Sequence, residues 1–244
     1  MLGRRRSFAE AVQSRRKTAR RLGILFLVFL SYECLSGLFL SAFWMRSQAM
    51  SPTVQSGDRL LASPLAYGPR TIFGKLPGLG RPEHGDIVVV EPNYVRRLGF
   101  WEKFADAFVR FVTFQLVSIS SGGPDGMLAA PTLQRVVGVP GDTIRMDDFV
   151  FKVKTAGSDQ FLTEFELSTS RYDISHVAPP ELWRSDMPGS GQLAETTLGP
   201  DQYFLAGDAR SSSSDSRLWG PVGTDRFKAK VLLRYWPPKR FGTP

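Results

Sequence analysis

The sequence predicts a mostly β domain that follows an N-terminal membrane helix. After residue 45 the chain alternates short runs of β-branched and aromatic residues with Gly, Pro and Asp turns, which is typical of a β domain. Before it stand a basic segment and a long apolar run. A chain of 244 residues is long enough for one well-buried domain with an appendage.

The positive charge of the chain is concentrated at its beginning. The net charge is +8, and residues 1–21 hold eight of the 31 Lys and Arg residues against a single acid, Glu10. The rest of the chain is therefore nearly neutral, which argues against a nucleic-acid partner for the globular part. A basic arm directly before an apolar run favours a membrane surface instead.

The apolar run covers residues 22–44 and is long enough to cross a bilayer as a helix. Arginines precede it, so the positive-inside rule places the N-terminus in the cytoplasm and residues 45–244 outside it. Trp44 fits an aromatic anchor at the outer boundary. Ser-Gln-Ala at 47–49 would also suit a signal cleavage site, but the run is longer than the apolar core of a secretory signal. We therefore expect an uncleaved anchor.

Two polar or reactive side chains fall inside the apolar run. Glu33 is costly there, and two interpretations remain open: it contacts a partner membrane protein, or it is protonated and hydrogen-bonded to Ser31 or Ser36. The single cysteine, Cys34, lies beside it, so the exterior domain contains neither disulfides nor thiol chemistry.

The β core is expected in two pieces, residues 45–154 and 200–244. Its strands are predicted from short apolar runs bounded by turn residues. These runs cover residues 59–61, 86–90, 135–139, 143–146, 149–153, 203–206 and 230–236.

Two segments interrupt this pattern. Residues 98–119 place their aromatic side chains at helical spacing with charges mostly opposite, which predicts an amphipathic helix. Its apolar face either packs on the β core or lies on the bilayer surface beside the anchor; the density of Phe and Trp favours the bilayer. Residues 155–199 are polar and mixed, with Pro and Gly loops, and are expected to form an inserted subdomain.

Three separated motifs indicate the family. They are SQAMSPT at 47–53, QRVVGVPGD at 134–142 and GDARSSSSDSRLWG at 207–220, with GDIVVV at 85–90 between the first two. In order and internal spacing they resemble the motifs of bacterial type I signal peptidases, S-x-S-M-x-P-T, K-R-x-x-G-x-P-G-D and G-D-N-x-x-x-S-x-D-S-R-x-W-G. The resemblance implies the signal-peptidase-type β fold outside the cytoplasm.

The resemblance also implies a Ser/Lys dyad, in which a neutral lysine takes the proton of the attacking serine. The nucleophile of the family falls on Ala49, and its general base falls on Gln134. Alanine has no nucleophilic atom, and a glutamine amide is not a base. Both members of the dyad are therefore substituted in this chain.

Most of the frame around the dyad is retained. The family's oxyanion-hole serine falls on Ser47, and the serine that bonds the lysine falls on Ser213, where it could meet the Gln134 amide. Asp208 and Arg135 also keep their places, whereas the Asn of the family is Ala209. The other retained positions are Met50, Pro52 and Thr53 of the nucleophile turn and the supporting ion pair Asp215 and Arg217.

The resemblance therefore predicts a catalytically inactive homologue in the bacterial inner membrane. It would bind signal peptides or preproteins or scaffold protein export. Its expected partners are membrane lipid and, through Glu33, another membrane protein, and no cofactor or metal is expected. The main alternative is an active signal peptidase that uses Ser51 or Ser47 as its nucleophile. Neither serine has a base at the expected place, because that place is Gln134 and the histidines His84 and His176 lie in other parts of the sequence. Deliberate inactivation and a purely structural envelope protein are the remaining alternatives.

Overall fold

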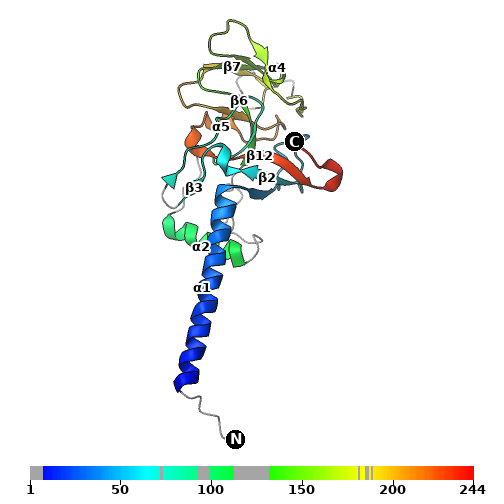
Figure 1. Ribbon diagram of the computed structural model, residues 1–244. Helices are drawn as coiled ribbons and strands as arrows, with labels where there is room; N and C mark the ends of the chain where they lie inside the picture. Colours follow the sequence, from blue (N-terminus) through cyan, green and yellow to red (C-terminus); the bar gives the residue numbers. More distant parts are fainter. Residues whose placement is uncertain are drawn as a thin grey trace.

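The computed structural model describes residues 8–71, 74–92, 99–112, 132–180, 182–184, 187 and 189–244. A long helix, α1 (Phe8–Leu38), projects from a body built of β-sheets, and its first residues lie farthest from that body (Figure 1). A second helix, α2 (Phe100–Val112), lies beside α1 below the body. The predicted mostly β fold is confirmed.

The expected helix over residues 22–44 is wrong at its C-terminal end. α1 ends at Leu38, and β1 (Ser41–Trp44) pairs antiparallel with β2 (Arg59–Ser63) at the edge of a sheet. The reason is packing, because Phe43 rests against the buried core instead of facing lipid. Within the part of the chain that the structure describes, no helix combines the length and the apolar character that crossing a membrane requires.

The larger sheet has six strands in the order β1-β2-β12-β5-β6-β11, each antiparallel to its neighbours. Strands far apart in the sequence are therefore adjacent, since β12 near the C-terminus separates β2 from β5. The strands not yet given are β5 (Ile87–Val90), β6 (Thr132–Gly138), β11 (Phe204–Ala206) and β12 (Phe227–Trp236).

The second sheet has four strands in the order β10-β7-β8-β9, and a two-stranded ribbon pairs β3 with β4. Its strands are β7 (Thr143–Asp147), β8 (Val150–Lys154), β9 (Leu162–Thr163) and β10 (Leu193–Thr197), and the ribbon is β3 (Arg70–Thr71) and β4 (Gly74–Lys75). All seven predicted apolar runs coincide with strands. The division into a core and an inserted subdomain stays a prediction, and residues 155–199 supply β9 and β10 to this sheet.

Short helical turns connect the strands. Helix α4 carries a capping box, in which the Thr163 hydroxyl accepts from the Glu166 N–H and the Glu166 carboxylate accepts from the Thr163 N–H. The turns are η1 (Pro64–Ala66), α4 (Glu164–Leu167), α5 (Ser216–Trp219), η2 (Thr224–Arg226) and η3 (Pro238–Arg240).

The same Gly-Asp turn occurs three times at strand ends. Each glycine has a positive φ, between 86° and 96°, which a side chain would strain. Each aspartate then hydrogen-bonds through its N–H and its carboxylate to the residue three positions earlier. The pairs are Asp58 with Gln55, Asp86 with Glu83 and Asp142 with Val139.

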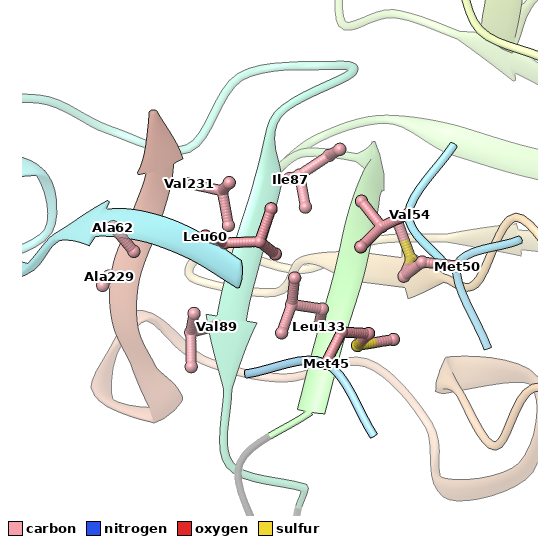
Figure 2. Packing of buried hydrophobic residues seen from close by; sticks show 10 residues of the cluster. All are labelled: Met45, Met50, Val54, Leu60, Ala62, Ile87, Val89, Leu133, Ala229 and Val231. Carbon is pink, nitrogen blue, oxygen red and sulfur yellow. The ribbon is translucent and has the colours of Figure 1, made fainter. Parts of the chain in front are cut away.

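The core of the six-stranded sheet is drawn in Figure 2. Side chains of β2, β5, β6 and β12 converge there, and Met45, Met50 and Val54 join them from the loop between β1 and β2. Because Met50 and Val54 are fully buried, this loop is fixed by hydrophobic packing at two points.

Helix α2 confirms the described part of the amphipathic helix predicted for residues 98–119; residues 98 and 113–119 lie outside the described residues. Its aromatic side chains meet α1, where Phe29 is in edge contact with Phe104, Phe108 and Phe111 at centroid separations of 5.0–6.3 Å. The aromatic contacts of the described part of α2 are thus with α1.

Candidate functional site

The loop between β1 and β2 carries Ala49, the position that the resemblance assigns to the nucleophile. It is folded by main-chain hydrogen bonds from Ser51 N–H to the Gln48 carbonyl (3.0 Å) and from Val54 N–H to the Met50 carbonyl (2.8 Å). Ala49 is partly exposed and lies in the chain between the buried side chains of Met45 and Met50. The turn is therefore held in place by its hydrogen bonds and buried side chains, and residue 49 reaches the surface.

The segment at 207–210 packs directly against this turn. The Ala209 N–H donates to the Ala49 carbonyl at 3.0 Å. At Gly207 a side chain has no room, since an added Cβ would lie 2.5 Å from the Ala49 carbonyl oxygen and 2.4 Å from the Ser213 Cβ. Glycine at 207 is what allows the segments carrying Ala49 and Ser213 to approach each other.

Gln134, the position that the resemblance assigns to the general base, is buried on β6. Its side-chain Nε2 donates to the Ser214 carbonyl at 3.0 Å. Its Oε1 has no hydrogen-bond partner among the described residues. The expected contact of the Gln134 amide with Ser213 is not formed; the amide bonds to the next residue instead.

Ser213 is instead bound to a carboxylate and a guanidinium. Its hydroxyl donates to Asp215 and accepts from Arg217 Nη2 at 2.9 Å. Arg217 also holds Asp215 through both carboxylate oxygens, at 2.8 and 2.7 Å, and the same carboxylate accepts from the Gly207 N–H. Asp215, which is also the N-cap of α5, thus ties the 207–217 segment together.

A fully buried ion pair stands next to Gln134. Arg135 binds Asp208 with Nε and Nη2, at 2.8 and 2.7 Å, and both side chains are 0% exposed. The Nη1 of Arg135 donates to the Gly85 carbonyl at 2.8 Å, and the guanidinium lies 3.7 Å above the ring of Tyr172. The pair therefore joins the second motif, the third motif and the turn before β5.

A further group of buried polar contacts adjoins this pair and was not predicted from the sequence. The Tyr172 hydroxyl donates to Glu164, Arg210 binds the same Glu164 carboxylate, and Arg210 Nη1 donates to the Gly207 carbonyl at 3.2 Å. The capping box of α4 could have located the helix, but no local pattern marks Glu164 as a buried acid.

Of the remaining candidate residues, Ser47 and Pro52 belong to the loop that carries Ala49, and the others lie elsewhere in the chain. The Ser47 hydroxyl accepts from the Ala49 N–H at a long 3.5 Å, and Pro52, exposed, lines a pocket of about 250 Å³ with Tyr172 and Arg234. His84 lies 2.7 Å from Asp142, and His176 stacks on Phe149. The side chain of Glu33 lies outside the described part of the structure.

Comparisons with known proteins agree on one family. The model for "Signal peptidase, peptidase S26" matches residues 16–236. Similar proteins include "Probable signal peptidase I-2" of Synechocystis sp., 24% identical over 82% of this chain, "Signal peptidase I" of Leptolyngbya laminosa, 23% over 82%, and "Signal peptidase IB" of Staphylococcus aureus, 23% over 81%. This chain covers 64%, 70% and 78% of the lengths of these relatives, respectively.

Removing one charge of the buried pair should destabilise the whole fold. In Asp208→Asn the Arg135 guanidinium stays buried without its counter-ion, which typically costs about 3–5 kcal/mol of unfolding free energy. Denaturant unfolding of the full chain in detergent measures the loss. Asp159→Asn, at an exposed carboxylate, is the matched control and should change stability by about 0.5 kcal/mol or less. Equal stability of the two variants would contradict the role given to the pair.

Stability should also fall at alkaline pH. Burial, and then the carboxylate of Glu164, raises the pKa of Tyr172 well above its ordinary value near 10. The neutral phenol is therefore favoured in the folded state, and its contribution is present below pH 10 and lost as the pH rises above that value. Melting temperatures measured from about pH 8 to about pH 11, an interval that brackets the ordinary tyrosine pKa near 10, should drop less steeply in Tyr172→Phe. Parallel curves would rule out this linkage.

Proposed function

The chain belongs to the signal peptidase family, peptidase S26, and from that premise we propose that it is a catalytically inactive member that binds signal peptides or preproteins without cutting them. One observation carries this proposal. The two dyad positions hold Ala49 and Gln134, yet the segments around them remain closely packed and hydrogen-bonded.

The chemistry of the two side chains supports inactivity. Acyl transfer from a peptide needs a nucleophilic atom and a group that takes its proton. A methyl group at position 49 supplies no nucleophile. The Gln134 amide cannot accept a proton at neutral pH, and its nitrogen is engaged with the Ser214 carbonyl.

The packing of the same region supports retained binding. Gly207, Ala209 and Ala49 are in direct contact, and Ser213 remains tied to Asp215 and Arg217. A site that kept its main-chain shape would still accept an extended chain by strand-like hydrogen bonding. Scaffolding of an active peptidase or of export machinery would use the same surface.

A membrane location is part of the proposal. Exposed cations of α1 at 15–21 precede its exposed apolar side chains at 22–28, which suits anionic headgroups beside hydrocarbon. α2 adds exposed apolar side chains to this surface while it buries an acidic one. Its Trp101 and Phe108 are 77% and 53% exposed, whereas Asp106 on the other side of the helix is 3% exposed. Phe108 also contacts Phe29 of α1, so the apolar side of α2 is only partly covered, and its exposed part is suited to lipid.

We accordingly propose a single-pass protein of the bacterial inner membrane, with its N-terminus in the cytoplasm and its β body outside. Glu33 remains the proposed contact to another membrane protein.

The first experiment compares cleavage of a preprotein by the detergent-solubilised chain and by Ala49→Ser/Gln134→Lys. We expect the natural chain to be inert and the double variant to cut after the signal sequence, because the substitutions restore nucleophile and base to an intact frame. Each single substitution is the control and should stay inert, since neither half of a dyad suffices.

Cleavage by the natural chain would overturn the proposal. The next variants would then be Ser51→Ala and Ser47→Ala, and loss of activity in either would identify the nucleophile of an active signal peptidase. Failure of the natural chain to bind a synthetic signal peptide would contradict the binding role.

The membrane proposal predicts lipid contact at α2. In a Cys34→Ser background, a fluorophore attached at Phe108→Cys should be quenched by brominated phospholipid vesicles containing phosphatidylglycerol. The same label at Val177→Cys is the control, since Val177 is equally apolar and 73% exposed but belongs to the β body. Equal quenching at both positions, or none at Phe108→Cys, would contradict the assignment.

A further inference from the structure

Residues 170–177, called the strap here, have no regular secondary structure apart from one bridge and run beside the candidate site. Ser175 makes a parallel bridge to Ala209, in the segment that contacts Ala49. The strap belongs to the polar region between β9 and β10, for which no functional motif was predicted.

Tyr172 and Ile174 are the partly buried residues of the strap between 171 and 177. Tyr172 packs beneath the Arg135 guanidinium, but Asp173, Ser175, His176 and Val177 are all exposed. Directed contacts hold this outer half: the Val177 N–H donates to the Ser211 hydroxyl at 2.7 Å, and His176 stacks on Phe149. An exposed segment fixed mainly by hydrogen bonds owes its position to those particular bonds.

Ser175 makes three of these bonds, and together they reach both sides of the site. Its N–H donates to the Asp208 carbonyl at 2.9 Å, and its carbonyl accepts from the Arg210 N–H at 2.7 Å. Its hydroxyl donates to the Ser51 carbonyl at 3.0 Å. The strap therefore links the turn that carries Ala49 to the 207–210 segment from outside.

The hydroxyl is the part of this link that depends on residue type. Any residue except proline could make the two main-chain bonds, whereas the bond to Ser51 needs a side-chain donor of this length. Ser51 lies two residues after Ala49, and its own N–H is engaged with the Gln48 carbonyl. Fixing the Ser51 carbonyl therefore fixes the far side of the turn.

We propose that Ser175 is a positioning residue whose hydroxyl sets the geometry of the Ala49 turn and thereby the affinity of the site for an extended peptide. The part concerning affinity rests on the proposed function; the part concerning the turn does not. The strap thus couples the region between β9 and β10 to the site.

The test is hydrogen exchange of the full chain in detergent, with and without a synthetic signal peptide. Without peptide, Ser175→Ala should speed exchange of the Ser51 and Val54 amides about three- to tenfold, the range expected for losing one hydrogen bond. Peptide affinity should fall by a similar factor. Ser175→Thr should restore both, because it keeps the hydroxyl. Ser170→Ala, on the same strap but outside the tether, should match the natural chain.

The outcomes separate the two proposals. Unchanged exchange in Ser175→Ala, or the same acceleration in Ser175→Thr, would overturn the positioning role whether or not any peptide binds. Faster exchange with unchanged peptide affinity would overturn the control of affinity. If no variant binds peptide, the proposed function fails, while the exchange data still decide whether Ser175 fixes the turn.

Discussion

The buried pair of Arg135 and Asp208 is the interaction on which the site depends. Withdrawing two charges from water is costly, and the cost is offset here by bidentate geometry and by a further bond from Arg135 to the Gly85 carbonyl. Gln134 precedes the arginine on β6, and Gly207 and Ala209 flank the aspartate. The pair therefore joins the strand that carries Gln134 to the segment whose Ala209 N–H donates to the Ala49 carbonyl.

A second charged pair extends this constraint into the other sheet. Arg210 and Glu164 are both buried, and Glu164 also accepts from the Phe151 N–H on β8. Tyr172 lies between the two pairs, stacked on Arg135 and bonded to Glu164. Buried polar networks of this kind are favourable only when their members are mutually satisfied. The two sheets are consequently expected to loosen together rather than one by one.

Local patterns predicted the strands, since apolar alternation and Gly-Asp turns are readable over a few residues. They could not predict where α1 ends, because residues 41–44 are as apolar as the helix, and pairing with β2 determines their conformation. Nor could they predict the contact of Glu164 with Arg210, two residues joined only by tertiary folding. From the motif spacing, Gln134 was expected to meet Ser213, but its amide bonds to the neighbouring Ser214 carbonyl. Side-chain direction depends on packing, which the motifs do not specify.

The junction between α1 and the β body is very short. Phe39 and Leu40 alone separate the end of the helix from β1, and β1 is hydrogen-bonded along its length to β2. A connection of two residues restricts how far the helix and the β body can turn relative to each other. The orientation of the Ala49 turn is therefore linked to the orientation of the helix through the pairing of β1 with β2.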